Sequence, residues 1–151
     1  MKIIEGTSGR FPIALVVSRF NSEVTDQLLK GAIERLKELD FQDSDILIVK
    51  VPGAIEIPVV AQRLAQQGVY SAIVALGAVI RGDTSHFDYV CEQVSDGCRH
   101  IALQYDLPVI FGVLTTDTDE QALARVTPTN HKGREAIDAA VETVSVLKTL
   151  G

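Results

Sequence analysis

The stretch Ala72-Ile73-Val74-Ala75-Leu76-Gly77-Ala78-Val79-Ile80 runs directly into Arg81-Gly82-Asp83-Thr84-Ser85-His86-Phe87. The first part is apolar and rich in β-branched and small side chains, which is typical of a strand that is buried on both faces. The second part gathers charged, hydroxyl and imidazole groups around one glycine, and a helical pattern begins at Phe87. Because ligands of open α/β sheets bind at the carboxyl ends of the strands, this junction predicts a reaction site.

Strands and helices alternate along the rest of the chain. We expect strands at 13–17, 46–51, 72–80 and 109–114. Helical patterns follow at 22–39, up to about 67, 87–105, 119–125 and 133–150, with Asn21 and Ser22 as caps of the first helix and Pro58 in the first turn of the second. Four parallel strands with right-handed crossovers predict an α/β fold, a three-layer α/β/α sandwich of the flavodoxin-like class.

The chain shows no repeat, low-complexity tract or linker, so we expect a single domain over residues 1–151. Residues 1–12 form an N-terminal lead-in that we expect to pair with an edge strand, either of this chain or of a neighbouring subunit. Hydrophobic residues make up 46% of the chain and aromatic residues only 5%, so the surplus is aliphatic. This composition indicates that apolar surface is buried between subunits.

The net charge argues against some classes of binding partner, and the cysteines indicate the cellular compartment. A net charge of −6 argues against binding to nucleic acid or to an anionic membrane, both of which need a basic face. No apolar run is long enough for a membrane helix, and the first residues are too quickly charged for a signal peptide. Cys91 and Cys98 lie seven residues apart on a predicted helix and cannot pair with each other, so we expect reduced, buried thiols and a cytoplasmic protein.

The carboxyl ends of the four predicted strands would bring polar segments to one rim. These segments are Ser18–Asn21, Pro52–Glu56, Arg81–His86 and Thr115–Thr118. Phe20 has nothing local to pack on, so it is either a stacking platform for a flat substrate or a side chain buried against the next helix. Glu56, in the first turn of a helix, is a candidate site residue, although carboxylates are also favoured there by the helix dipole.

His86 lies at or just before a helix start, where a neutral imidazole could relay protons near pH 7. Thr84 and Ser85 precede a helix N-terminus and could bind an anion, or Thr84 could be only the cap. Arg125 and Lys132 could grip a phosphate, or could be solvated charges at a helix end. The three histidines show no metal-ligand spacing, so no metal site is expected.

Several ordered blocks of the chain resemble the lumazine synthase family, and the match runs essentially from end to end. The blocks are Ser18-Arg19-Phe20-Asn21, Pro52-Gly53-Ala54-Ile55-Glu56-Ile57-Pro58, Gly77 to Phe87, Phe111-Gly112-Val113-Leu114-Thr115, Glu120-Gln121-Ala122 leading to Arg125, and Lys132-Gly133. The resemblance implies the condensation of 5-amino-6-(D-ribitylamino)uracil with 3,4-dihydroxy-2-butanone 4-phosphate to 6,7-dimethyl-8-ribityllumazine, a transferase reaction of riboflavin biosynthesis that releases phosphate and water and needs no cofactor.

The resemblance also assigns roles to positions of this chain. On the side of the uracil substrate, it implies stacking by Phe20, ribityl contacts from Ala54, Ile55 and Glu56, backbone hydrogen bonds from Ala78, Val79 and Ile80, and a wall formed by Phe111 of the adjacent subunit. On the side of the butanone phosphate, it implies phosphate contacts from Asp83, Thr84 and Arg125, proton transfer by His86, and additional candidates in Asn21 and Lys132.

The implied assembly is a homo-oligomer, a pentamer that closes into an icosahedral shell in some cases, and riboflavin synthase is an implied partner. Two departures from the family pattern stand out. Ile55 occupies a position that is usually aromatic, and the 126–132 loop is about one residue shorter than usual. Three rival hypotheses are the archaeal type of riboflavin synthase, a non-catalytic flavin or pterin carrier, and a purely structural shell protein. The complete His86 block argues against the riboflavin synthase, and the intact set of pocket residues favours the enzyme over the carrier and the shell protein.

Overall fold

A four-stranded parallel sheet forms the centre of the computed structural model, which describes residues 1–151. The strands lie in the order β2-β1-β3-β4, so β1 and β3 are central and β2 and β4 are the edges. Their bounds are Ile13–Ser18 for β1, Ile46–Val51 for β2, Ala72–Ile80 for β3 and Val109–Thr116 for β4. All four predicted strands are therefore present, and β1 and β4 extend slightly further than expected.

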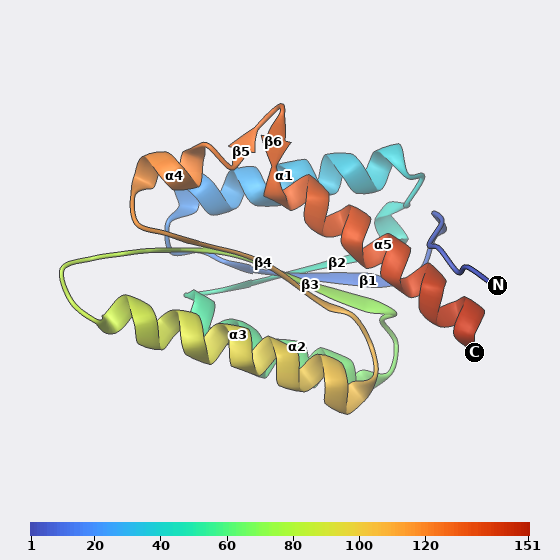
Figure 1. The fold of residues 1–151 in the computed structure, drawn as a ribbon. Helices are drawn as coiled ribbons and strands as arrows, with labels where there is room; N and C mark the ends of the chain where they lie inside the picture. The colour runs from blue at the N-terminus through green and yellow to red at the C-terminus, as the bar shows by residue number, and fades with distance from the viewer.

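Helices cover both faces of this sheet (Figure 1). On one face lie α1 (Ser22–Glu38) and α5 (Lys132–Leu150), and on the other lie α2 (Ile57–Gln67) and α3 (His86–Tyr105). The short elements are the 3₁₀ turns η1 (Asp43–Asp45) and η2 (Ala54–Glu56) and the helix α4 (Asp119–Leu123). This arrangement confirms the predicted three-layer α/β/α, flavodoxin-like class.

The sheet separates two apolar clusters, one beneath each pair of helices. In β1, Ile13, Leu15 and Val17 point to the cluster of α1 and α5, whereas Ala14 and Val16 point to the cluster of α2 and α3. The same alternation continues in β3, whose residues 72–79 are all buried. Because both faces of the central strands are covered, these strands consist of continuous apolar runs rather than alternating patterns.

A small hairpin lies where the sequence was interpreted as a loop. Its strands are β5 (Val126–Thr127) and β6 (Asn130–His131), and they pair antiparallel between α4 and α5. The prediction that the preceding helix extends to residue 125 was wrong, because α4 ends at Leu123. Strands of two residues carry no readable period, so the sequence pattern could not indicate this hairpin.

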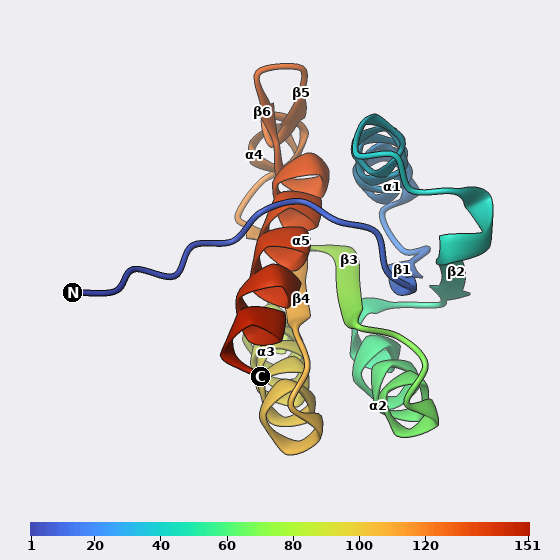
Figure 2. The ribbon, with the colours of Figure 1, turned by 90° about the vertical axis from the view of Figure 1, so that its right-hand side faces the viewer.

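Residues 1–12 form neither helix nor strand, so the lead-in does not pair with an edge strand of its own chain. The segment crosses α5 and extends away from the rest of the molecule (Figure 2). The Thr7 amide donates a hydrogen bond to Ser145 Oγ at 3.0 Å, whereas Met1 and Ile3 are exposed. Pairing with a neighbouring subunit stays a prediction. None of the helices combines the length and apolar character that crossing a membrane requires.

Candidate active site

A pocket of about 320 Å³ opens at the carboxyl ends of β1 and β3, next to the turn that follows β2. The strand order reverses direction between β1 and β3, and such a switch point is where open α/β sheets bind ligands. We call this cavity the switch-point pocket. Its lining consists of Phe20, Asn21, Gly53, Ala54, Ile55, Glu56, Ala78, Val79, Ile80, Gly82, Thr84, His86, Phe87 and Val90.

The turn after β1 provides an aromatic ring that is open to solvent. The Phe20 side chain is 71% exposed, so its burial against the next helix is excluded and a free platform remains. Its backbone amide donates to the Pro52 carbonyl at 3.0 Å, which holds the turn against the end of β2. The ring therefore has a fixed base, while its face stays available for stacking.

Asn21 is the N-cap residue of α1, as predicted, but its side chain makes no cap hydrogen bond. The residue has a left-handed backbone with φ of 63°, a conformation that asparagine tolerates better than most side chains. Its amide Nδ2 instead donates to the Ala78 carbonyl on β3 at 2.9 Å. This hydrogen bond joins the turn after β1 to the end of β3 across the floor of the pocket.

The turn after β2 is ordered by the Glu56 carboxylate. Oε1 accepts the Gly53 amide hydrogen at 2.8 Å, and Glu56 lies in η2 rather than in the first turn of α2. Pro58 is in the first turn of α2, as predicted. The hydrogen bond leaves Oε2 without a partner in the chain, so one carboxylate oxygen can accept a further hydrogen bond at the pocket. Ile55, at 37% exposure, forms part of the lining beside it.

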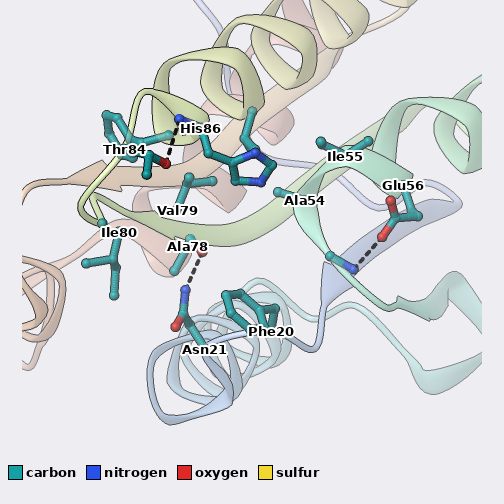
Figure 3. Close-up of a pocket in the computed structure, with 14 residues that line it drawn as sticks. Phe20, Asn21, Ala54, Ile55, Glu56, Ala78, Val79, Ile80, Thr84 and His86 are labelled. Carbon is teal, nitrogen blue, oxygen red and sulfur yellow. Dashed lines mark hydrogen bonds between the residues drawn. The ribbon is translucent and has the colours of Figure 1, made fainter.

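His86 is the first residue of α3, and its imidazole faces the same space as the Phe20 ring (Figure 3). The His86 amide donates to Thr84 Oγ1 at 3.3 Å, so the Thr84 hydroxyl shapes the turn that leads into the helix. Ser85 occupies the N-cap position without a side-chain cap bond. The backbone of 78–80 approaches the imidazole from β3. The pocket thus places a proton carrier opposite a stacking platform.

Arg81 does not line the switch-point pocket, although the sequence suggested that its charge joins the site. Its Nε atom lies 2.8 Å from Asp117 Oδ1 and its Nη1 lies 3.5 Å from Asp88 Oδ1. The guanidinium also stacks over Phe87, with Cζ 4.3 Å from the ring centroid. The hydrogen bond with Asp117 is the main cause of the raised pKa of Arg81. These contacts tie the end of β3 to the start of α3 and to the turn after β4.

Three further candidate residues line a second cavity on the open edge of β4. Phe111, Arg125 and Lys132 belong to a groove of about 470 Å³ that shares no residue with the switch-point pocket. We call it the β4-edge groove. Arg125 Nη1 donates to the Gln121 carbonyl at 2.8 Å and has no carboxylate partner, whereas Lys132 pairs with Glu135 at 3.3 Å. The groove therefore has one cation that no carboxylate neutralises.

The remaining predicted residue, Asp83, is exposed on the turn between two lining residues but does not line the pocket itself. Sequence reasoning did not assign Phe87 and Val90 to the site. Val90 lies four residues after His86 on α3, so the helical period could have indicated it, whereas Phe87 is the next residue and does not share that face. Gly53 and Gly82 contribute backbone only, and no side-chain pattern could have singled them out.

The cysteines and the metal-binding side chains form no second centre. Burial raises the pKa of the Cys98 thiol to about 11, and burial likewise raises the pKa of the Cys91 thiol. Both thiols are free, as predicted. No group of three or more His, Cys, Asp or Glu side chains is arranged to hold a metal ion.

Comparison with known proteins gives one consistent match. Residues 10–148 match the family model described as 6,7-dimethyl-8-ribityllumazine synthase. A 6,7-dimethyl-8-ribityllumazine synthase of Coxiella burnetii strain Dugway 5J108-111 is 53% identical over 145 residues, which cover 95% of this chain and 96% of that protein. The proteins of the same description from strains CbuG_Q212 and RSA 493 are 52% identical over the same shares.

Proposed function

The chain belongs to the 6,7-dimethyl-8-ribityllumazine synthase family, and from this premise we propose how its residues carry out the reaction. The reaction condenses 5-amino-6-(D-ribitylamino)uracil with 3,4-dihydroxy-2-butanone 4-phosphate to 6,7-dimethyl-8-ribityllumazine in riboflavin biosynthesis, with release of phosphate and water. One observation carries the proposal: Phe20, the 54–56 and 78–80 segments, Thr84 and His86 surround one pocket.

The switch-point pocket takes the uracil substrate. The pyrimidine ring stacks on Phe20, which is exposed and faces the cavity. The backbone of Ala78, Val79 and Ile80 supplies hydrogen bonds to the ring, as the resemblance implies. The ribityl chain runs along the 54–56 turn, where the unbonded Glu56 oxygen is an acceptor for its hydroxyl groups.

His86 moves the protons of the reaction. The ring amine attacks the ketone carbon of the butanone, and the resulting carbinolamine must gain a proton on its oxygen before water leaves. The imidazole faces the pocket from a fixed helix start, so it can donate that proton and then accept one during loss of phosphate. An amine and a ketone condense readily once they are aligned, so most of the assistance comes from orientation.

The phosphate of the butanone binds next to Thr84 and Asp83, and its main cation comes from Arg125. No lysine or arginine lines the switch-point pocket, whereas the β4-edge groove holds Arg125 and Lys132 beside Phe111. We therefore propose that the groove of one subunit faces the pocket of the next, so that each complete site lies between two subunits. Arg125 then stabilises the departing phosphate by charge-assisted hydrogen bonds.

A pocket that meets a groove is a head-to-tail contact, which forms a closed ring when the rotation between subunits closes. A homopentamer, as the resemblance implies, is such a ring. Residues 1–12 extend from the molecule, and we expect this segment to pair with a neighbouring subunit. The rest of the chain belongs to the same single domain in this proposal. Association with riboflavin synthase and a cytoplasmic location stay predictions.

The test is to mix the purified protein with both substrates and to follow lumazine formation by absorbance, with the uncatalysed condensation subtracted. We expect a rate well above that background. Tight binding of lumazine or flavin without any acceleration contradicts the proposal and favours a carrier. Acceleration that starts from lumazine alone, with riboflavin as the product, identifies the archaeal type of riboflavin synthase instead.

A further inference from the structure

His131, which has no part in the proposed chemistry, fills a slot between α1 and α5. It is the last residue of β6 and the N-cap of α5. The slot exists because Gly31 in α1 has no side chain, since a Cβ there would overlap the imidazole. A Cβ at Gly133 would collide first with the Leu28 carbonyl oxygen of α1 and would also lie 3.0 Å from imidazole Cε1. Glycine inside a helix lowers helix stability relative to alanine, so Gly31 is unfavourable for α1 by itself. The need to accommodate the imidazole explains why glycine occupies position 31.

The polar contacts of the imidazole hold the start of α5. Nδ1 accepts the Arg134 amide hydrogen at 3.3 Å, which caps the helix. The ring also interacts with the Gln27 backbone of α1, and burial lowers the pKa of His131. The acceptor role of Nδ1 requires the neutral ring. The charged groups around it are Lys30 and Glu34 of α1 and Arg134 and Glu135 of α5.

The hairpin links this slot to both cations of the β4-edge groove. Val126 pairs with His131 across the two strands, and the Lys132 amide donates to the Arg125 carbonyl at 2.9 Å. Asn130 Nδ2 donates to the Ala124 carbonyl at 3.0 Å. Arg125 and Lys132 are thus the two residues that flank the hairpin, and their backbones are joined by a hydrogen bond. Any shift of the hairpin relative to α1 moves both cations.

We propose that His131 is a positioning residue that docks the β5–β6 hairpin onto α1 and thereby fixes Arg125 and Lys132 for the phosphate group of the substrate. The inference rests on the proposed function, because it takes a phosphate ester as the ligand of the groove. His131 itself touches no substrate. Its loss should therefore weaken phosphate recognition and leave recognition of the uracil substrate unchanged.

The first experiment compares His131→Ala and His131→Asn in steady-state kinetics at pH 7.5. The apparent KM for the butanone phosphate should rise roughly fivefold in His131→Ala, a loss of about 1 kcal/mol of binding free energy, because Arg125 and Lys132 are then held less firmly. The KM for the uracil substrate should stay the same. His131→Asn retains an oxygen acceptor at the N-cap but does not fill the slot at Gly31, so it should recover only the part of the loss that comes from the cap. His100→Ala, at an exposed position on α3, is the matched control and should match the wild type.

The second experiment tests the slot itself with Gly31→Ala. A methyl group at position 31 collides with the imidazole, so the single variant should show the same rise in KM for the phosphate substrate. In a His131→Ala background the slot is empty, so Gly31→Ala should cause no further rise. This non-additive result requires direct contact between the two positions.

Two results overturn the proposal: an unchanged KM for the phosphate substrate in His131→Ala, or additive effects of the two substitutions. A readout without turnover separates this test from the proposed function. Inorganic phosphate should raise the Tm of the wild type and should raise that of His131→Ala less. If the wild type makes no lumazine, the proposed function fails. Independently of that result, equal shifts of Tm by phosphate in the wild type and in His131→Ala overturn the role of His131.

Discussion

The switch-point pocket and the β4-edge groove differ in what they contain and in where they lie on the sheet. The pocket lies at the ends of the central strands and has an aromatic ring, an imidazole and a carboxylate, but no lysine or arginine. The groove lies along an edge strand and has Arg125 and Lys132, but no imidazole. This division supports the proposal that one chain carries two half-sites, one for the uracil substrate and one for a phosphate.

The position of each half-site on the sheet explains this division. Between β1 and β3 the crossovers leave in opposite directions, so the turns spread apart and leave a cavity within one chain. The outer edge of β4 has no neighbouring strand, and Phe111 on it is 40% exposed. Proteins cover such edges, and a second subunit is one way to do so. The exposed edge therefore supports the proposal that the groove completes a cavity of a neighbouring chain.

The largest effect should come from the pocket half. His86→Ala should lower kcat roughly hundredfold, the lower end of what general acid–base catalysis contributes, because orientation supplies the rest. Assembly should be unaffected, since the imidazole faces a cavity. Stopped-flow or steady-state absorbance measures the rate, and size-exclusion chromatography checks the assembly. An unchanged kcat removes His86 from the mechanism.

The groove half should respond mainly in the KM for the butanone phosphate, with a smaller fall in kcat because Arg125 also stabilises the departing phosphate. Arg125→Ala should raise the KM for the butanone phosphate by roughly tenfold to a hundredfold, the range expected when a hydrogen bond to a charged group is lost. Arg63→Ala is the matched control, because Arg63 is exposed on α2 and lines neither cavity. Equal KM values for the two variants would show that the groove does not bind the phosphate.

A smaller effect distinguishes the stacking platform from the rest of the pocket. Phe20→Ala should raise the KM for the uracil substrate roughly fivefold. This is the change in affinity expected when an aromatic stacking interaction of about 1 kcal/mol is lost. Phe20→Tyr should retain the wild-type value, and neither variant should change the KM for the phosphate. If Phe20→Ala changed only the KM for the butanone phosphate, stacking of the uracil substrate on Phe20 would be contradicted.

The smallest effect concerns pH and the hairpin next to the groove. Burial lowers the pKa of His131 in the folded chain, so the unfolded chain binds a proton more readily. The stability that the neutral ring contributes is complete above the unfolded pKa of about 6.5 and is lost as the pH falls below it. The Tm of the wild type should therefore fall more than that of His131→Asn between pH 7.5 and 5.5. Parallel decreases would contradict the buried, neutral imidazole.

The sequence predicted the sheet and the pocket because both depend on patterns within short segments. The apolar run of β3 and the polar turn after it indicated a buried strand and its functional end, and Phe20, Glu56 and His86 were identified on the same rim. The role of Arg81 could not be predicted, because its partners Asp88 and Asp117 lie on other elements. A cation in a polar turn has the same pattern whether it faces a ligand or two carboxylates.

The sequence pattern also could not predict that Arg125 and Lys132 line a groove that is separate from the pocket. Arg125 and Lys132 follow α4 and the hairpin, and nothing in their spacing tells which cavity they line. The docking of the hairpin depends on a glycine in α1 that is a hundred residues from His131 in the chain. Sequence patterns report local periodicity, and such contacts between distant segments are set only by the packing of the folded chain.

Mixed assemblies of His86→Ala and Arg125→Ala test most directly whether each site is shared between subunits. At a butanone phosphate concentration well below the KM of Arg125→Ala, each variant should be poorly active alone. When the two are unfolded together in equal amounts and refolded, a site with an intact pocket from one chain and an intact groove from another should form at about a quarter of the interfaces, by random assembly in a ring. If each site is shared between two subunits, the activity of the refolded mixture should rise to about that fraction of the wild-type rate. A mixture no more active than the average of the two variants would contradict it, because every site would then lie within one chain.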